Sequence, residues 1–340
     1  SAIYGEGAQN AIDMAVEEIN AGDSGYKIEI VNGGKVADDA KDAKQAMNAY
    51  NKVMADSPEA IVGSFFSSVT LPMAEQASKD GMLLLATGAT NADVTLKGDT
   101  IFRNCFIDPY QGQLMASYAS KKLNAKTAAI LYDSGDPYST GIADAFEEAA
   151  KKEGMEVTNK EGYASKSTDF KTQLTTIKGK SPDVLLIPVY YGDVALIVDQ
   201  IQQQGITSKL LGADGWDGVA AQLDAASADV VKNAYFCSQY SASSTDPDLQ
   251  AFLTKYKEKN GKEANMFAVL GYDSMQIMAA AIDKAGSTDS DKIIEALKAT
   301  EYKGLTGTTT FYDKRNPVRE AIITSFDGLN YKVVESYSMS

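Results

Sequence analysis

The 340-residue chain carries a formal net charge of −14, with 44% hydrophobic and 23% charged residues. This composition is typical of a folded globular protein long enough for about two domains of ~150 residues each. Phosphate backbones and anionic lipid surfaces attract clustered Lys and Arg, so the acidic balance argues against nucleic acid and anionic membranes as partners. No stretch approaches the ~20 consecutive apolar residues that a bilayer span needs.

The chain contains no histidine. This absence excludes Ser-His-Asp triads, Cys-His pairs, HExxH zinc sites and histidine general bases. The sequence also lacks an acidic calcium-binding loop and a glycine-rich phosphate loop, so we expect no metal and no cofactor. Cys105 and Cys237 are far apart in the sequence and could form either a disulfide or two buried thiols; we expect thiols.

Helices and strands are predicted to alternate along the chain. Residues 8–20 form an amphipathic helix pattern, residues 26–31 alternate as a strand, and residues 39–54 again have a helical pattern. Residues 60–66 and 82–86 are nearly continuous apolar runs, typical of parallel strands that are covered on both faces. Further strands are predicted at 101–107, 127–132, 155–163, 184–189, 209–212 and 234–239, and helices at 111–122, 140–153, 169–178, 194–204 and 218–226.

The last hundred residues change in character. Three helices are predicted at 247–260, 266–284 and 289–300, followed by strands at 306–312, 319–326 and 331–337. The last two strands are joined by Asp327-Gly328, a hairpin signal. The alternation before residue 240 implies right-handed βαβ units and parallel sheets, so the fold class is doubly wound α/β.

Small hydroxylic residues follow both apolar runs. Ser67, Ser68 and Thr70 follow the first run, and Thr87 and Thr90 follow the second, at the carboxyl edge where open α/β sheets bind ligands. If Ser68 or Thr70 caps the next helix, further backbone N–H groups would face outward with a partial positive charge. Such a helix end holds a carboxylate without a cationic side chain. The alternative is that these residues serve only as turn and cap residues.

A second set of polar and aromatic residues follows three later strands. Tyr138, Tyr190 and Asp214 each lie in a predicted turn at the carboxyl end of a strand. Taken singly, each tyrosine is more simply explained as a half-buried packing residue, and Asp214 as a helix cap. Because all three turns meet the same edge of one sheet, their convergence favours a binding site.

Two segments carry a family resemblance. GSFFSSVTLPMA at 63–74 and GMLLLATGATNADVT at 81–95 resemble the first-lobe binding segment of the periplasmic leucine/isoleucine/valine-binding proteins, which have the type I periplasmic binding fold. The resemblance implies that Ser67 and Thr90 bind an α-carboxylate. It also implies that the Thr90 hydroxyl and the Ala89 carbonyl accept hydrogen bonds from the α-ammonium.

The resemblance extends to the second set. It implies that the rings of Tyr138 and Tyr190 close over the ligand and that Asp214 pairs with the ammonium. Family members often carry Glu at the Asp214 position, and Asp is one methylene shorter, so either the lobes close further or a water intervenes. The side-chain pocket is expected to be apolar, with walls from Tyr4, Phe65, Phe66, Tyr138, Tyr190, Trp216 and Phe267.

The same resemblance implies two doubly wound parallel-sheet lobes joined by a three-crossover hinge. Lobe 1 would comprise residues 1–107 and 238–317, and lobe 2 residues 108–237 and 318–340. The family opens with an apolar strand before an A-x-Y-G segment, which corresponds here to residues 2–5. We expect that strand to lie outside the present sequence, because a missing central strand would leave buried backbone groups unpaired.

The function implied is that of the extracytoplasmic solute-binding component of an ABC importer, binding a branched-chain or similar apolar amino acid between two closing lobes. The expected partner is the membrane permease, the expected state a monomer, and the expected place the periplasm or, as a lipoprotein, the outer face of the cell membrane. Alternatives are a sensor module of the same fold and a binder of another small carboxylate or amide. An enzyme using Ser67 as nucleophile is disfavoured, because no lysine is placed to act as its base.

Overall fold

The computed structural model describes residues 2–31, 41–312 and 315–339. It divides into two compact units, the first made of Ser1–Phe106 and Ser244–Arg319 and the second of Ile107–Ser243 and Glu320–Ser340. The chain therefore passes three times from one unit to the other. The division predicted from the sequence, after residues 107, 237 and 317, differs from these boundaries by one, six and two residues.

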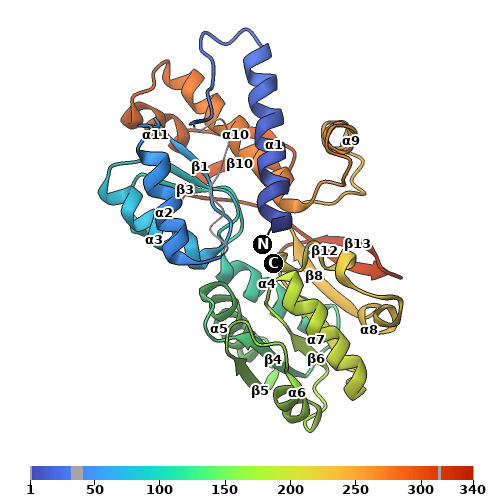
Figure 1. The fold of residues 1–340 in the computed structure, drawn as a ribbon. Coiled ribbons are helices and arrows are strands. Elements are labelled where there is room, and N and C mark those ends of the chain that lie inside the picture. Colours follow the sequence, from blue (N-terminus) through green and yellow to red (C-terminus); the bar gives the residue numbers. More distant parts are fainter. Residues whose placement is uncertain (1, 32–40, 313–314, 340) are drawn as a thin grey trace. The chain divides into compact units, whose positions relative to one another are not determined.

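The first unit combines a parallel sheet with helices and a small antiparallel sheet (Figure 1). Its elements are α1 (Ala2–Ala21), α2 (Ala43–Met54), β1 (Ile61–Gly63), α3 (Ser67–Lys79), β2 (Leu84–Ala86), the 3₁₀ turn η2 (Thr95–Lys97), β3 (Ile101–Arg103), α9 (Pro247–Asn260), α10 (Met266–Ala285), α11 (Ser290–Lys298), β9 (Glu301–Gly304), β10 (Gly307–Tyr312) and β11 (Asn316–Pro317).

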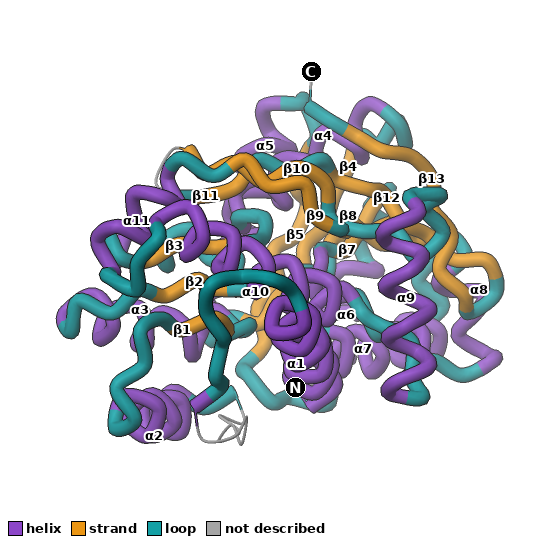
Figure 2. Tube along the Cα trace, turned by 90° about the horizontal axis from the view of Figure 1, so that it is seen from above, coloured by secondary structure: helices purple, strands orange, loops and turns teal. Residues whose placement is uncertain are grey.

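The apolar run that contains β2 forms the centre of the parallel sheet β1-β2-β3, whose strands lie next to one another in Figure 2. Successive side chains of a strand point to opposite faces. Leu83 and Leu85 accordingly join a core cluster with α1, α10 and α11, whereas Leu84 and Ala86 join a second cluster with α2 and α3. The sheet is thus covered on both faces, as its continuous hydrophobicity predicts.

The strand predicted at 26–31 is wrong. Residues 27–30 form no ladder, although Ile28 and Ile30 do pack against the core cluster with Val62. Alternation specifies which side chains face a core, but a strand also needs a neighbour to receive its backbone hydrogen bonds. Here the Ile28 amide instead donates to Oδ1 of Asn20 at 2.7 Å.

The second unit holds a seven-stranded sheet. Its elements are α4 (Asp108–Lys121), β4 (Thr127–Asp133), α5 (Pro137–Lys152), β5 (Glu156–Tyr163), α6 (Lys171–Lys178), β6 (Val184–Leu186), α7 (Tyr191–Gln204), β7 (Lys209–Gly212), three 3₁₀ turns η3 (Asp214–Trp216), η4 (Val219–Gln222) and η5 (Ala225–Ser227), α8 (Ala228–Val231), β8 (Ala234–Ser238), β12 (Ala321–Asp327) and β13 (Asn330–Tyr337). The strand order is β13-β12-β8-β7-β6-β4-β5.

Strands β4 to β8 pair in parallel, and β12 and β13 add two antiparallel strands at one edge. The βαβ alternation predicted from the sequence is confirmed here. The Asp327-Gly328 hairpin is confirmed as well, because Asp327 pairs with Asn330 and Gly328 has φ +61°. The short strands β9 and β11 were not predicted; β9 lies between the helix predicted at 289–300 and the strand predicted at 306–312.

Both cysteines are buried thiols that form no disulfide. The expectation of two thiols is therefore confirmed, and burial raises the pKa of the Cys237 thiol well above its ordinary value. Across residues 2–31, 41–312 and 315–339, no helix combines the length and the apolar composition of a membrane span.

Candidate functional site

Helix α3 begins in the first unit without a side-chain cap. Its N-cap residue is Phe66, so Ser68 and Thr70 lie inside the first turn and the predicted cap at either residue is wrong. Thr70 Oγ1 donates back to the Phe66 carbonyl at 2.8 Å, whereas the buried Oγ of Ser68 has no hydrogen-bond partner among the described residues. A helix N-terminus of this kind presents N–H groups and a hydroxyl to an external acceptor such as a carboxylate.

The turn after β2 is tied to this helix end. The amides of Thr87 and Gly88 both donate to the Ser64 carbonyl at 3.2 Å, and the Asn91 amide donates to Oγ of Ser67 at 3.1 Å. Ser67 keeps its hydroxyl proton for a further bond. The buried Thr90 Oγ1 has no partner in the described part of the chain, and a buried hydroxyl is normally hydrogen-bonded. The structure thus brings Ser67 and Thr90 together with unused hydrogen-bonding capacity.

Four aromatic residues predicted as pocket walls form one cluster in the first unit. The ring centroids of Tyr4 and Phe267 are 4.0 Å apart, those of Phe65 and Phe267 5.8 Å, and those of Tyr4 and Phe66 5.9 Å. Gly88 faces this cluster, because a Cβ at that position would come within 2.8 Å of the Phe267 ring and 3.1 Å of Phe65. The turn after β2 and the aromatic cluster are therefore in contact.

We expect Gly88→Ala to weaken ligand binding about five- to a hundredfold, because overpacking a filled site costs ~1–3 kcal/mol. The new methyl group would push against Phe267, which is buried against Tyr4 and cannot withdraw freely. Isothermal titration of the variant would measure the loss. Gly5→Ala is the matched control, since a Cβ there meets nothing within 4 Å, and its affinity should equal that of the unmodified protein.

The Ala89 carbonyl, predicted as an acceptor for the ligand's ammonium, already accepts a hydrogen bond from Nη1 of Arg103 at 2.9 Å. The guanidinium is a full positive charge, and a second cation at the same oxygen would be repelled by it. This contact disfavours the predicted role of Ala89 and leaves the hydroxyl of Thr90 as the better acceptor in this turn.

In the second unit, Tyr138, Tyr190 and Asp214 lie together. The rings of Tyr138 and Tyr190 stack with centroids 4.5 Å apart and an interplanar angle of 16°. Tyr138 Oη donates to Oδ1 of Asp214 and accepts from the Gly215 amide, both at 2.8 Å. Burial and the adjacent carboxylate raise the pKa of Tyr138 well above its ordinary value, so the hydroxyl stays protonated and orients Asp214.

Asp214 is a buried carboxylate with a perturbed proton affinity. Burial raises its pKa to about 6, against the lowering effect of the hydrogen bonds from Tyr138 and neighbouring groups. Its backbone amide donates to Oε1 of Gln111 at 2.9 Å, which fixes the turn from α4. Perturbed carboxylates of this kind are concentrated at functional sites, where a cationic group of a ligand restores the charged form.

Trp216 was predicted as a possible pocket wall, but the structure gives it a packing role. Its indole has no exposed surface, its Nε1 donates to the Ile187 carbonyl at 2.8 Å, and it stacks on Phe236 within the core of the second unit. A large ring two residues after Asp214 is as easily explained by the core as by a pocket, and the sequence pattern does not distinguish the two. The packing of its indole disfavours Trp216 as a pocket wall.

The sequence analysis considered Ser68 only as a possible helix cap and gave no role in the candidate site to Gly88, Gln111 or Gly215. Gly215 is required because a Cβ would come within 2.7 Å of Tyr138 Oη and 3.1 Å of the Tyr190 ring. Its place immediately after Asp214 in a turn was a usable signal, since glycine allows close approach of other groups. Gln111 had no such signal, because its partners are distant in the sequence.

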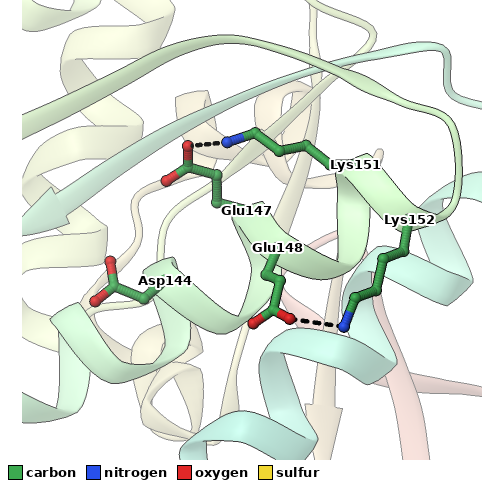
Figure 3. A pocket seen from close by; sticks show the side chains of 5 residues that line it. All are labelled: Asp144, Glu147, Glu148, Lys151 and Lys152. Atoms are coloured by element: carbon green, nitrogen blue, oxygen red, sulfur yellow. Dashed lines mark hydrogen bonds and ion pairs between the residues drawn. The ribbon is translucent and has the colours of Figure 1, made fainter.

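A surface hollow over α5 does not have the features of a site. Figure 3 shows its five charged side chains, in which Lys151 pairs with Glu147 and Lys152 with Glu148, both at 2.6 Å and four residues apart. Such exposed pairs are solvated and contribute little. In the described part of the chain, no group of three His, Cys, Asp or Glu side chains is placed to hold a metal ion.

Comparison with known proteins identifies the family to which this fold belongs. The family model described as periplasmic binding protein matches residues 1–328. The chain belongs to the periplasmic binding protein family. One relative is the Leu/Ile/Val-binding protein BraC3 of Rhizobium johnstonii. It is 31% identical to this chain over 304 residues, which cover 87% of this chain and 80% of that protein.

Two solved structures extend the comparison. The leucine-binding protein LivK of Thermotoga maritima has a TM-score of 0.90 and 28% identity, covering 98% of this chain and 94% of that one. The branched-chain amino acid transporter substrate-binding protein LivJ of Streptococcus pneumoniae, in complex with isoleucine, has a TM-score of 0.88 and 32% identity, covering 98% and 95%. The predicted family and the type I periplasmic binding fold are thereby confirmed.

Proposed function

We propose that this chain is the extracytoplasmic solute-binding component of an ABC importer and that its ligand is an apolar amino acid. The observation that carries the proposal is the complementary chemistry of the two residue sets. The first unit offers a helix end without a side-chain cap and the hydroxyls of Ser68 and Thr90, which have no partner among the described residues and suit a carboxylate. The second offers the buried carboxylate of Asp214, which suits an ammonium.

The aromatic cluster supports an apolar ligand side chain. Tyr4, Phe65 and Phe267 in the first unit, and Tyr138 with Tyr190 in the second, provide ring surface without a full charge. Burying a Val or Leu side chain against such surface is worth ~1.5–3 kcal/mol. LivJ of Streptococcus pneumoniae, with 32% identity, was solved with isoleucine, which has a side chain of this class.

The proposal is tested by titration calorimetry on protein that has been unfolded and refolded to remove carried-over ligand. Leucine, isoleucine, valine and phenylalanine are compared with isocaproate, which lacks the ammonium, and with isoamylamine, which lacks the carboxylate. We expect binding of the amino acids and loss of binding with both analogues. Equal binding of isocaproate would overturn the amino-acid assignment in favour of a small-carboxylate binder.

We expect the affinity for an amino acid to depend on pH through Asp214. Its pKa is about 6 in the folded protein, and the ligand's ammonium needs the ionised form, so a proton must leave before binding below that pH. The dissociation constant should therefore rise about tenfold for each pH unit below about 6 and stay flat between about 7 and 8.5. Titrations from pH 4.5 to 8.5 would show this break, and a flat profile would contradict it.

The remaining parts of the proposal follow from the same assignment. We propose a membrane permease as partner and a monomer as the working state. We also propose that the protein has no catalytic turnover, because the chain has no imidazole. Ser67 accepts from the Asn91 amide and has no base beside it among its described contacts. Light scattering of the purified chain would test the monomer, and an assay for hydrolysis of amino-acid amides would test the absence of turnover.

A further inference from the structure

Arg103 is a buried arginine that the binding chemistry described above does not use. It is the last residue of β3 and has no exposed surface. Its guanidinium lies under the turn that follows β2. Nη1 donates to the carbonyls of Ala89 and Asn91 at 2.9 and 2.8 Å, and Nη2 donates to the Ala92 carbonyl at 3.1 Å and to Thr95 Oγ1 at 3.4 Å.

These four bonds use the planar fork of one guanidinium to fix the backbone on both sides of Thr90. A planar guanidinium presents several donors in fixed directions, whereas the ammonium of lysine is a compact point charge and cannot hold the same set. The turn is also held to α3 by the bond from the Asn91 amide to Ser67 Oγ. Arg103 and helix α3 therefore hold the same turn through separate hydrogen bonds.

Two hydroxyl groups depend on the position of this turn. Thr90 Oγ1 is buried without a partner in the described residues, and Ser67 Oγ is held by the turn through Asn91. The family resemblance assigns both of these hydroxyls to the carboxylate of the ligand. A shift of the turn by a fraction of an ångström would misplace these groups together with the first N–H groups of α3.

We propose that Arg103 is a positioning residue that holds residues 89–92 in the geometry that recognises the ligand's carboxylate. The proposal rests on the proposed function, because the carboxylate belongs to the amino acid assigned there. Arg103 does not contact the ligand in this scheme. It sets the discrimination between a carboxylate and a neutral group at the same position.

The test compares Arg103→Lys with Arg315→Lys. Arg315 is a matched control because its guanidinium lies close by and donates to the Thr95 and Ile101 carbonyls at 2.6 and 3.0 Å, but within the described part of the chain it makes no hydrogen bond to residues 89–92. Leucine and leucinamide are titrated into each variant. Leucinamide keeps the ammonium and side chain and replaces the carboxylate with a neutral amide.

For Arg103→Lys we expect the affinity for leucine to fall at least about tenfold, the effect of losing a hydrogen bond to a charged group, and that for leucinamide to fall less than about threefold. Arg315→Lys should leave the ratio of the two affinities unchanged. A parallel loss for both ligands in Arg103→Lys, or no loss, would overturn the proposal. Thr95→Val removes one acceptor of Arg103 and should shift the ratio in the same direction if the lysine variant does not fold.

Hydrogen exchange of the unliganded protein separates this inference from the proposed function. In Arg103→Lys the amides of Asn91 and Asp93 should exchange faster than in the unmodified protein, and in Arg315→Lys they should not. If the unmodified protein binds no amino acid, the proposed function fails and the exchange rates alone decide whether Arg103 holds the turn. Unchanged exchange at both amides would overturn the positioning role.

Discussion

Asp214→Asn is expected to abolish amino-acid binding and at the same time to stabilise the unliganded protein. Removing one partner of a buried charge pair leaves the other charge uncompensated, so the ligand's ammonium should lose ~3–5 kcal/mol of binding free energy, or at least about a hundredfold in affinity. Asparagine keeps the shape of the side chain and an oxygen to accept from Tyr138 Oη. The loss should therefore report the charge and not a collapse of the turn.

The gain in stability follows from the pKa of Asp214. In the unfolded chain the carboxyl ionises near its ordinary value of 3.8, and in the folded protein near 6, because burial disfavours the charge. The neutral form thus stabilises the folded state below about pH 4, and this contribution is lost as the pH rises through 6. At pH 7 the neutral asparagine should make the unliganded protein more stable by on the order of 1–3 kcal/mol.

Urea unfolding at pH 5 and pH 7, without ligand, measures this second effect. Asp133→Asn is the matched control, since Asp133 is a buried carboxylate of the same unit that bonds to the Gly135 amide and Ser165 Oγ, and not to the predicted ligand-binding residues. Its substitution should cost stability and leave the affinity nearly unchanged. An Asp214→Asn protein that still binds leucine tightly would remove Asp214 from the site.

The parts of the fold and site that could be predicted depend on local patterns. The apolar run containing β2 predicts a strand covered on both faces because only a two-sided core uses every residue of such a run. Tyr138, Tyr190 and Asp214 follow β4, β6 and β7, which are neighbours in one parallel sheet, so topology alone brings their turns to one edge. Their stacking and hydrogen bonding then follow from proximity.

The parts that could not be predicted depend on partners distant in the sequence. From the sequence, Gly88 is indistinguishable from an ordinary turn glycine. In the structure, a Cβ at this position would lie 2.8 Å from the ring of Phe267, on α10. Arg103 reads as a charged residue at a strand end, where exposure is the usual expectation, yet it is fully buried by carbonyl partners. Polar residues satisfied by backbone carbonyls leave no periodic signal, because any sequence supplies those carbonyls.

Asp273 is another residue whose role depends on partners distant in the sequence. It interrupts the most apolar helix of the chain, where the sequence alone shows only a charge that breaks a hydrophobic stretch. In the structure its buried carboxylate accepts from the Leu305 amide at 2.8 Å, the Thr306 amide at 2.9 Å and Thr306 Oγ1 at 2.7 Å. Burial raises its pKa, while the nearby positive charge of Arg319 opposes that rise.

This carboxylate organises the end of the first unit. Arg319, buried as well, donates to the Thr306 carbonyl at 3.1 Å and to the side chain of Asn104. Asn104 donates in turn to Ser274 Oγ on α10 at 3.0 Å. Asn104 and Arg319 lie two residues or fewer from the points at which the chain leaves this unit. The network therefore ties together, within the first unit, the segments that precede two of the three chain crossings.

Asp273→Ala is expected to destabilise the protein by about 3–5 kcal/mol, because the substitution leaves the buried charge of Arg319 and two backbone amides without compensation. Urea unfolding followed by circular dichroism would show the lowered midpoint. Asp248→Ala is the control, since Asp248 is exposed and faces Lys303 at 4.0 Å, a contact worth less than about 1 kcal/mol. If Asp273→Ala unfolds at the same urea concentration as Asp248→Ala, then Thr306 and Asn104 satisfy Arg319 by themselves, and the carboxylate does not hold this part of the fold.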